Sequence, residues 1–528
     1  MEASLMDKEV LCLLDTRQIQ KYMFKSNTLQ DVLGGSDSIL HIQMDAIRYA
    51  LVHTDPLLTE REYALSLDPD EEIPWFVSPE IQFQLIICAA GNAMCLVRTG
   101  RLCQQLIRKM SRYYLEHGYS LNLAAAVTEK TDDFGHDIFE LYRKLNAVKA
   151  SCEISDPAGP LSVVAREART GEPAIGRDGT GAYYSTASAL RRKEAALRRN
   201  VVDLPHFRTS RGYDGREYLA VLHSDGNNLG ITIGRMMQQT ASYEAGIRIR
   251  RIIGRTIAET YGRVIDHTLE DVRACWQKTP GRAQAPFECA FYVLHRGGDD
   301  LNIICDAALA IPFLNSLYRN LQGAVLWQSE EFTAPLYVCT GIAFVTKAAG
   351  FHDAFAMAEA CCVRAKTAAN RAPNLRNGFA GNWIDFQVCP EPRTQPLDLL
   401  RERTFVSRSG RRLLLRPYCA DPEAADRPYA FQKLLERAER IRRMQLTDRQ
   451  ADMLCQSYLS GGPEFRRWVE AMKSQGKDLV QQLGPPAYKD EAGMLSYAWM
   501  DALELSGFLP EGKQDGIDSD QYSRTGGL

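Results

Sequence analysis

The sequence lacks the features that mark membrane proteins, secreted proteins and proteins that hold nucleic acid through bulk charge. It has no apolar run close to the ~20 residues that a helix needs to cross a bilayer, and its first residues lack the pattern of a signal peptide. The net charge is only −3 over 528 residues, which argues against a general electrostatic grip on phosphates. We therefore expect a cytoplasmic protein without a membrane partner.

Cysteine pairs with metal-ligand spacing are also absent. The 14 cysteines include no C-x-x-C pair, the usual half of a zinc site. Several lie in apolar segments that predict strands: Cys88, Cys95, Cys289 and Cys339. They are expected to be reduced core residues, not disulfides or a zinc site. With 45% hydrophobic residues, the chain can bury large cores and should form three or four domains.

The chain is organised around the stretch from Phe291 to Cys305, in which two apolar runs are joined by Gly-Gly-Asp-Asp. Gly297 and Gly298 can adopt positive φ and let a ligand approach the backbone, which predicts a β-hairpin. Asp299 and Asp300 then lie side by side at its tip. Adjacent carboxylates repel each other, so a site that keeps both ionised holds a cation, and hard oxygen ligands select Mg²⁺ or Mn²⁺. The alternative is a solvated turn, because Asp and Gly are ordinary turn residues.

A further carboxylate upstream favours the site over the turn. Asp225 ends an apolar strand and is followed by Gly226. A strand ending in Asp-Gly, a long helical region and a hairpin with Asp-Asp at its turn is the order in which nucleotidyl-transferring palm domains bring three carboxylates together. Metal ions held there would bridge triphosphate oxygens and promote in-line displacement at phosphorus.

The order of predicted elements, β-α-β-β-α-β, occurs twice, which is the ferredoxin-like order. The first copy comprises strand 10–15, a helix to about Val52 that Ser36 or Asp37 could cap, hairpin 81–97, helix 101–117 and strand 121–127. The second comprises strand 217–223, helices between about 232 and 278, hairpin 288–305, helix 307–321 and strand 335–345. Superposing the hairpins places Ala89, Ala90, Gly91 and Asn92 where Gly297, Gly298, Asp299 and Asp300 stand. The first copy has lost the hairpin carboxylates, which suggests a platform for the acceptor nucleotide.

These residues resemble the large polymerase-cyclase subunit of type III CRISPR effector complexes and its stand-alone relatives. The resemblance covers most of the chain and rests on Asp15–Phe24 with Leu29–Ser36, Asp225–Gly230, Gly297–Asp300, and Gly341–Val345 followed by Ala358–Lys366. Active members of that family join ATP through 3′–5′ linkages into cyclic oligoadenylates, second messengers that switch on antiviral defence effectors. The resemblance implies that Asp225, Asp299 and Asp300 are catalytic and hold Mg²⁺ or Mn²⁺. It also implies that the nucleotide is contacted by Gly226, Asn228, Gly297, Gly298 and Lys366. Lys366 lies beside the core face of a helix expected from Asp353 to about Arg371, and the alternative is that it is a snorkelling surface lysine.

The expected fold class is therefore α+β, with two ferredoxin-like palm domains, a small connector and a C-terminal helical domain. The expected boundaries are 1–150 for the first palm, 151–212 for the connector with a remnant of a zinc module, 213–395 for the catalytic palm and 396–528 for the helical domain. Residues 511–528 are expected to be disordered.

Several departures from the family pattern limit the resemblance. Asn227 stands where many relatives have Asp and would bind metal more weakly. Arg169 stands where the zinc module would have a cysteine, so no zinc is expected. An N-terminal HD nuclease domain is not expected either, because the His-Asp pairs at 136–137 and 352–353 fall within or beside the palm elements. The basic clusters at 191–193 and 401–416 are expected to be solvated surface more often than phosphate tracks.

Two functions of different classes stay open. One is a cyclic-nucleotide synthase that uses ATP; the other is a scaffold that binds guide and target RNA inside a multisubunit complex, with little or no synthase activity. A diguanylate cyclase shares the palm but usually carries Phe after the acidic pair, where this chain has Leu301. ATP, RNA or other defence-complex subunits, and an effector that senses the product are the expected partners, and oligomerisation is left open.

Overall fold

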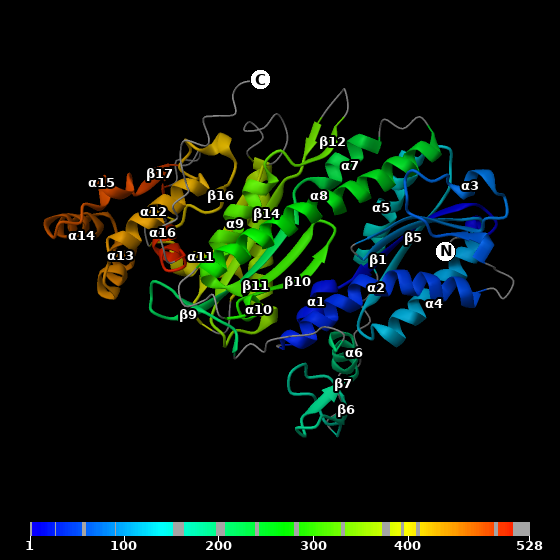
Figure 1. Cartoon of the computed structure of the whole chain (residues 1–528), viewed down its shortest axis with the longest axis horizontal. Helices are drawn as coiled ribbons and strands as arrows, with labels where there is room; N and C mark the ends of the chain where they lie inside the picture. Colours follow the sequence, from blue (N-terminus) through cyan, green and yellow to red (C-terminus); the bar gives the residue numbers. More distant parts are fainter. Residues whose placement is uncertain are drawn as a thin grey trace.

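The computed structural model describes residues 3–26, 28–54, 60–89, 91–151, 163–196, 206–237, 242–278, 285–328, 333–371, 381–391, 395–407, 412–489 and 495–510. The molecule is elongated: an N-terminal sheet with its helices, a central sheet with its helices and a C-terminal group of helices follow one another along the long axis (Figure 1). The predicted α+β class is confirmed. In the described part of the chain, no helix has the length and apolar character required to span a membrane.

The N-terminal sheet has five strands in the order β2-β3-β4-β1-β5. They are β1 (Val10–Arg17), β2 (Tyr63–Ala64), β3 (Phe83–Ala89), β4 (Asn92–Val97) and β5 (Asn122–Glu129). Alternate residues of β1 enter different apolar clusters, as the two-residue period of a strand requires. Val10, Cys12 and Leu14 pack with α2 (Leu29–Thr54) and α4 (Gly100–His117), whereas Leu11 and Leu13 pack with α5 (Phe134–Ser151).

The helix α2 begins seven residues before Ser36, so the predicted cap at Ser36 or Asp37 is wrong. The Val32 amide already donates to the Thr28 carbonyl, and the Gly-Gly-Ser motif lies inside the helix. The reason is tertiary: a Cβ on Gly34 would lie 1.8 Å from the carbonyl oxygen of Arg191 in α6 (Thr186–Ala195). Glycine there allows α6 to approach α2, and the buried Arg191 is structural, not part of a solvated basic face.

The central sheet has seven strands, in the order β10-β11-β9-β14-β15-β16 with β8 paired to β9. They are β8 (Ser210–Arg211), β9 (Glu217–Gly226), β10 (Phe291–Gly297), β11 (Asp300–Asp306), β14 (Val338–Val345), β15 (Trp383–Cys389) and β16 (Tyr418–Cys419). Helices α8 (Tyr243–Lys278) and α9 (Ala307–Leu321) pack on one face, and α10 (Phe351–Arg371) packs on the other.

Four strands of each sheet follow the same spatial order. If the four strands of each set are numbered along the chain, their order across the sheet is second, third, first, fourth. This gives β3-β4-β1-β5 in the N-terminal sheet and β10-β11-β9-β14 in the central sheet. The registers also correspond, because Asp15 pairs with Asn92 while Ser224, one residue before Asp225, pairs with Leu301, one residue after Asp300. Asp15 and Asp225 therefore occupy equivalent positions in the two sheets.

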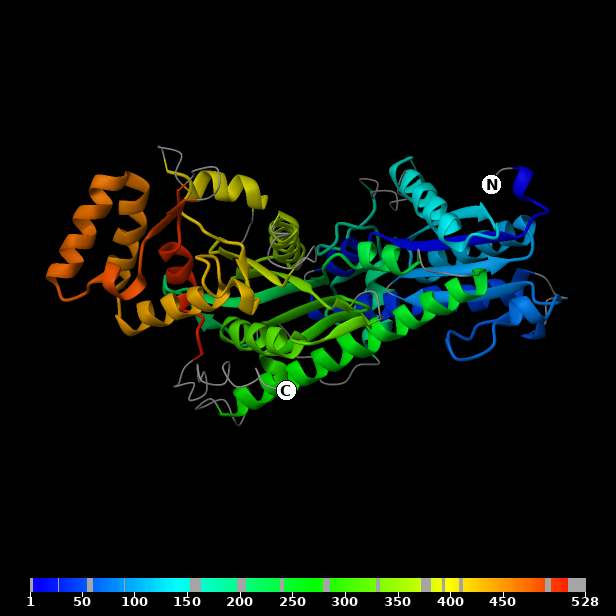
Figure 2. The same cartoon turned by 90° about the horizontal axis from the view of Figure 1, so that it is seen from above.

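The 36-residue helix α8 is shared by both sheets. At 1.5 Å per residue it is about 54 Å long. Near its start, Ile247 and Ile253 pack with the N-terminal sheet and the Arg251 Nη2 donates to the Leu85 carbonyl at 2.8 Å. Toward its end, Val272 and Trp276 pack in the core of the central sheet. Figure 2 shows α8 running alongside both sheets.

Shorter elements lie within and between these units. They are α1 (Ile19–Phe24), α3 (Pro74–Val77), β6 (Ala174–Arg177), β7 (Tyr183–Ser185), α7 (Leu229–Met237), β12 (Val325–Gln328) and β13 (Thr333–Pro335). The C-terminal region contains α11 (Leu397–Phe405), α12 (Phe431–Arg443), α13 (Asp448–Ser460), α14 (Gly462–Ser474), α15 (Leu479–Leu483), β17 (Ala487–Lys489), β18 (Leu495–Tyr497) and α16 (Trp499–Ser506). The tail at 511–528 lies outside the described residues.

Buried ion pairs join the C-terminal region to the central sheet. Arg416 donates to Asp501 (Nε to Oδ1, 2.8 Å) and to Glu504, and its side chain is fully buried. Arg401 pairs with the buried Asp385 of β15 through two nitrogens, each at 2.8 Å. The expectation of solvated arginines at 401–416 is therefore wrong for these two residues.

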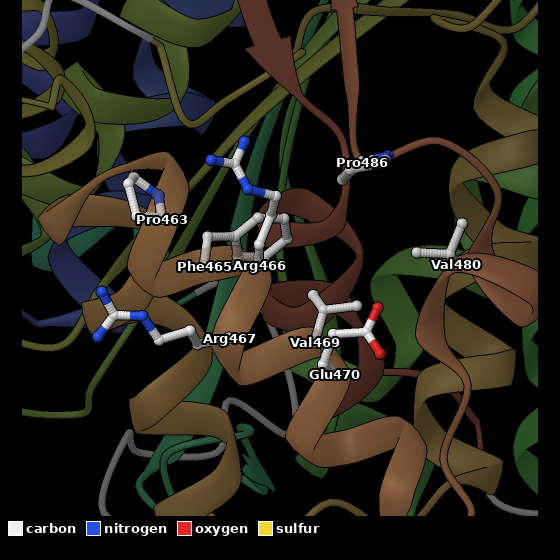
Figure 3. Close-up of a pocket in the computed structure, with 8 residues that line it drawn as sticks. All are labelled: Pro463, Phe465, Arg466, Arg467, Val469, Glu470, Val480 and Pro486. Atoms are coloured by element: carbon white, nitrogen blue, oxygen red, sulfur yellow. The ribbon is translucent and has the colours of Figure 1, made fainter.

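An open hollow of about 670 Å³ lies in the C-terminal region (Figure 3). Its walls come mainly from α14, with Val480 of α15 facing them and Pro486 completing the rim. None of the residues that the sequence predicts for the site lines it.

Candidate active site

The three predicted carboxylates meet where neighbouring strands of the central sheet end. Gly297 pairs with Asp300, so the hairpin turn contains only Gly298, with φ of 62°, and Asp299. Since β11 lies beside β9, the tip of this hairpin is adjacent to Asp225 at the end of β9. The predicted β-hairpin with carboxylates at its tip is confirmed.

Glycines at two positions make room for side chains beside the hairpin. A Cβ on Gly226 would lie 2.4 Å from the Asp299 Oδ2, so the Asp299 carboxylate lies over the backbone at the end of β9. A Cβ on Gly297 would lie 2.7 Å from the Nε2 of His295. Asn228 has φ of 59°, the left-handed conformation that Asn tolerates better than most residues, where the chain turns from β9 into α7.

Lys366 of α10 lies in the same site. Its Nζ is 2.5 Å from the Asp225 Oδ2. The close packing of α10 on the sheet explains this reach, because a Cβ on Gly341 of β14 would lie 2.2 Å from the backbone nitrogen of Cys362, one helical turn before Lys366. The long side chain thus covers the end of β9 and is part of the carboxylate cluster.

The electrostatics show an excess of negative charge. Burial raises the pKa of Asp299 to about 7, and repulsion from Asp225 adds to the shift. Burial likewise raises the pKa of Asp300 to about 6, with attraction to His223 and Lys366 opposing the repulsion from Asp225. Burial alone would lower the pKa of Lys366, but the Asp225 carboxylate outweighs it and raises that pKa. These carboxylates resist ionisation because they are shielded from solvent and close to one another. A bound cation would stabilise their ionised form.

The carboxylates suit a divalent metal in their chemistry, but their arrangement is not that of a preformed metal site. Across the described ranges, no group of three or more His, Cys, Asp or Glu side chains is arranged to hold a metal ion. In addition, one oxygen of Asp225 is held by Lys366. The oxygen donors of Asp225, Asp299 and Asp300 match the preference of Mg²⁺ and Mn²⁺, and Lys366 competes with a metal for one oxygen of Asp225.

Asn227, which the sequence suggests as a weak metal ligand, is held by the loops beside the site. Its side chain is buried, and its Nδ2 donates to the Gly381 carbonyl at 3.1 Å. Its backbone amide donates to the Tyr337 carbonyl at 2.8 Å. Asn227 thus anchors the neighbouring loops next to the site.

Sequence reasoning missed two polar residues beside the carboxylates. His223 of β9 and Asn302 of β11 are buried and lie directly opposite each other. The His223 Nδ1 lies 2.7 Å from the Asn302 Oδ1, and the Asn302 Nδ2 donates to the Asp300 Oδ1 at 3.1 Å. The available signal was a polar residue at an inward-facing position of each otherwise apolar strand.

The N-terminal sheet retains part of the same arrangement. Asp15, equivalent to Asp225, has its Oδ2 2.7 Å from the Nζ of Lys149 on α5. The helix α5 follows β5 as α10 follows β14, so the Asp-Lys pair is duplicated. Asn92 stands at the position of Asp300, as the hairpin alignment predicts.

No family model matches the chain, and neither does any curated protein. Solved structures do. The chain is similar to chains of the Csm1-Csm4 cassette. With one bound ATP, that structure has a TM-score of 0.49 and 13% identity, covering 95% of this chain and 70% of the other. The apo cassette has a TM-score of 0.48 and 14% identity, and the match covers 96% of this chain and 71% of the other. The Csm1-Csm4 subcomplex of the type III-A CRISPR-Csm interference complex has a TM-score of 0.49 and 13% identity, and the match covers 95% of this chain and 70% of the other. The last of these structures comes from a type III-A CRISPR complex, and the sequence motifs resemble the large subunit of type III complexes.

Proposed function

We propose that the chain is a metal-dependent nucleotidyltransferase that joins ATP into a cyclic (oligo)adenylate in antiviral signalling. One observation carries the proposal: the fold brings Asp225, Asp299 and Asp300 together where neighbouring strands end and places Lys366 across from them. The proposed catalytic palm, 213–395, is the central unit, and the first palm, 1–150, is the platform. The connector, 151–212, and the helical domain, 396–528, complete the proposed division.

The geometry supports a role for each of these residues. Asp225, Asp299 and Asp300 would hold Mg²⁺ or Mn²⁺, which when bound supplies Lewis-acid polarisation of phosphate oxygens and charge neutralisation. Lys366 exchanges its carboxylate partner, a monovalent anion, for the triphosphate, which carries more negative charge. Gly297 and Gly298 let the phosphates approach the hairpin backbone, while Gly226 and Asn228 shape the end of β9 beneath them.

The N-terminal unit is proposed to hold the acceptor nucleotide. It keeps an Asp-Lys pair, Asp15 with Lys149, at the equivalent place in its sheet but has Asn92 in place of a hairpin carboxylate. A site with one carboxylate and one lysine can position a nucleotide without assembling a catalytic metal cluster. The two units would then present one activated and one accepting nucleotide.

A second candidate is an RNA-binding scaffold of a CRISPR-type effector complex. It is favoured by the lack of a preassembled metal cluster among the described residues and by the neutralisation of Asp225 by Lys366. In that case the Asp-Lys pairs would be structural, and ATP would not be consumed.

The decisive experiment incubates the purified chain with each of the four ribonucleotides and Mg²⁺ or Mn²⁺, with and without RNA, and separates the products by chromatography with mass detection. We expect pyrophosphate release and a cyclic adenylate from ATP. The matched control is the double variant Asp299→Ala/Asp300→Ala, in which product should fall by orders of magnitude, because metal clamps supply several kcal/mol and each ~1.4 kcal/mol is a factor of ten in rate. RNA binding without any nucleotide product would select the scaffold instead.

A further inference from the structure

A buried polar pair lies behind the carboxylate hairpin. His223 is 5% exposed and Asn302 is fully buried, and the two are directly paired across β9 and β11. Both point to the face of the sheet that carries Asp225 and Asp300, since residues two apart on a strand share a face. The nearest metal-ligand candidate, Asp300, is two residues from Asn302 and is in contact with both members of the pair.

The hydrogen bonds run in one direction. The His223 Nδ1 faces two oxygens, the Asn302 Oδ1 at 2.7 Å and the Asp300 Oδ1 at 3.4 Å, so this nitrogen carries the proton. Asn302 accepts from His223 through Oδ1 and donates from Nδ2 to the Asp300 Oδ1. One oxygen of Asp300 is thereby used within the protein, and the carboxylate plane is set so that the other oxygen is left for a cation.

The N-terminal sheet shows what the fold alone requires at this place. Counting from the equivalent residues Asp15 and Asn92, the counterparts of His223 and Asn302 are Leu13 and Met94, which are paired in the same register and are buried. An apolar pair therefore suits this position in the sheet. Burial of two polar side chains brings a desolvation penalty that hydrogen bonding only offsets, so stability does not explain the polar pair in the central sheet.

We propose that His223 and Asn302 are positioning residues that fix the Asp300 carboxylate for cation binding. The inference rests on the proposed function of the carboxylate site and deepens it. Outer residues that orient metal ligands typically account for 10–100-fold in metal affinity, which sets the size of the effect to look for.

The test is Mn²⁺ binding by calorimetry on the metal-free full chain, with thermal denaturation to verify folding. The double variant His223→Leu/Asn302→Met installs the pair found in the N-terminal sheet. We expect it to fold with an unchanged or higher Tm and to bind Mn²⁺ about 10–100-fold more weakly. His223→Asn, whose amide nitrogen can take the place of Nδ1, should stay within a few-fold of the wild type. His223→Gln, whose amide nitrogen takes the place of Nε2, should bind as weakly as His223→Leu.

A double-mutant cycle identifies the residue through which the pair acts. If His223 works through Asp300, then His223→Leu should weaken Mn²⁺ binding in the wild type but have little further effect in Asp300→Asn. Wild-type affinity in the folded double variant, or equal losses in His223→Asn and His223→Gln, would overturn the positioning role alone. Failure of the wild-type protein to bind Mn²⁺ would overturn both proposals. Mn²⁺ binding with the predicted variant pattern but without nucleotide product would uphold positioning and reject synthesis.

Discussion

Replacing Asp299 with asparagine should stabilise the protein while abolishing its response to metal. The folded state raises the pKa of Asp299 from 3.8 to about 7, so the ionised carboxylate is less favourable in the folded chain than in the unfolded chain. The unfavourable contribution is absent below the unfolded pKa, grows as the pH rises between the two values and is complete above pH 7. Asparagine keeps the shape of the side chain and removes the charge.

The magnitude follows from the shift. A difference of about 3 pKa units corresponds to about 4 kcal/mol at 1.36 kcal/mol per unit. Because Asp299, Asp300 and Asp225 repel one another, part of this sum is shared, and we take about 2 kcal/mol as the gain for Asp299→Asn at pH 8. With about 2–4 °C per kcal/mol for a domain of 150–250 residues, the expected rise in Tm is roughly 4–8 °C.

Thermal denaturation with a chelator at pH 8, 6 and 4 measures the effect. The gap between Asp299→Asn and the wild type should shrink as the pH falls, because the wild-type carboxylate becomes protonated. Adding Mn²⁺ at pH 8 should raise the Tm of the wild type and leave that of the variant nearly unchanged.

Asp266→Asn is a matched control on the same unit. Asp266 is exposed and pairs with Arg296 of β10, an interaction that lowers the pKa of Asp266. Its removal should cost about 0–1 kcal/mol, with a loss that is larger at pH 8 than at pH 4. A Tm for Asp299→Asn that is equal to or below that of the wild type at pH 8, or a gap independent of pH, would refute the argument from burial and repulsion.

Three further changes test the same site. Lys366→Ala should release Asp225 and keep or strengthen Mn²⁺ binding measured by calorimetry. It should also raise the KM for ATP about tenfold or more in steady-state assays. Weaker metal binding would contradict the ion pair as a competitor of the metal. Asn92→Ala should leave Mn²⁺ binding intact, and its loss there, with Asp299→Asn unaffected, would reverse the assignment of the catalytic unit. Gly226→Ala should displace the Asp299 carboxylate, lowering both Mn²⁺ affinity and turnover at least tenfold with an intact fold by circular dichroism; normal affinity would show that Asp299 need not lie over β9.

The parts of the fold that sequence predicts best are those with local causes. The apolar run that ends in Asp225 and the Gly-Gly-Asp-Asp turn specify a strand and a hairpin through alternation and turn chemistry, and the structure has both. The start of α2 could not be predicted in this way. Gly34 within this helix is required by the close contact with Arg191, which is distant in the chain. Sequence patterns that mark helix starts are local and do not include such a contact.

The site shows the same division. Charge density suggested a solvated surface for Arg416, yet its partner Asp501 is 85 residues away and the pair is buried. His223 and Asn302 are each a single polar residue in an apolar strand, and only the register of β9 with β11 reveals that they face each other and Asp300. Long-range pairing therefore determines what local pattern leaves open.

The shared helix α8 makes the molecule a mechanical unit. Its sequence contains no proline, and a continuous hydrogen-bonded helix resists bending, so the sheets at its two ends cannot pivot freely about each other. Near its midpoint the Gly262 carbonyl accepts from the Nη2 of Arg296 at 2.9 Å, and Arg296 directly precedes the Gly-Gly-Asp-Asp turn. The N-terminal sheet and the strand that leads into the carboxylates are thus both anchored to a single rod.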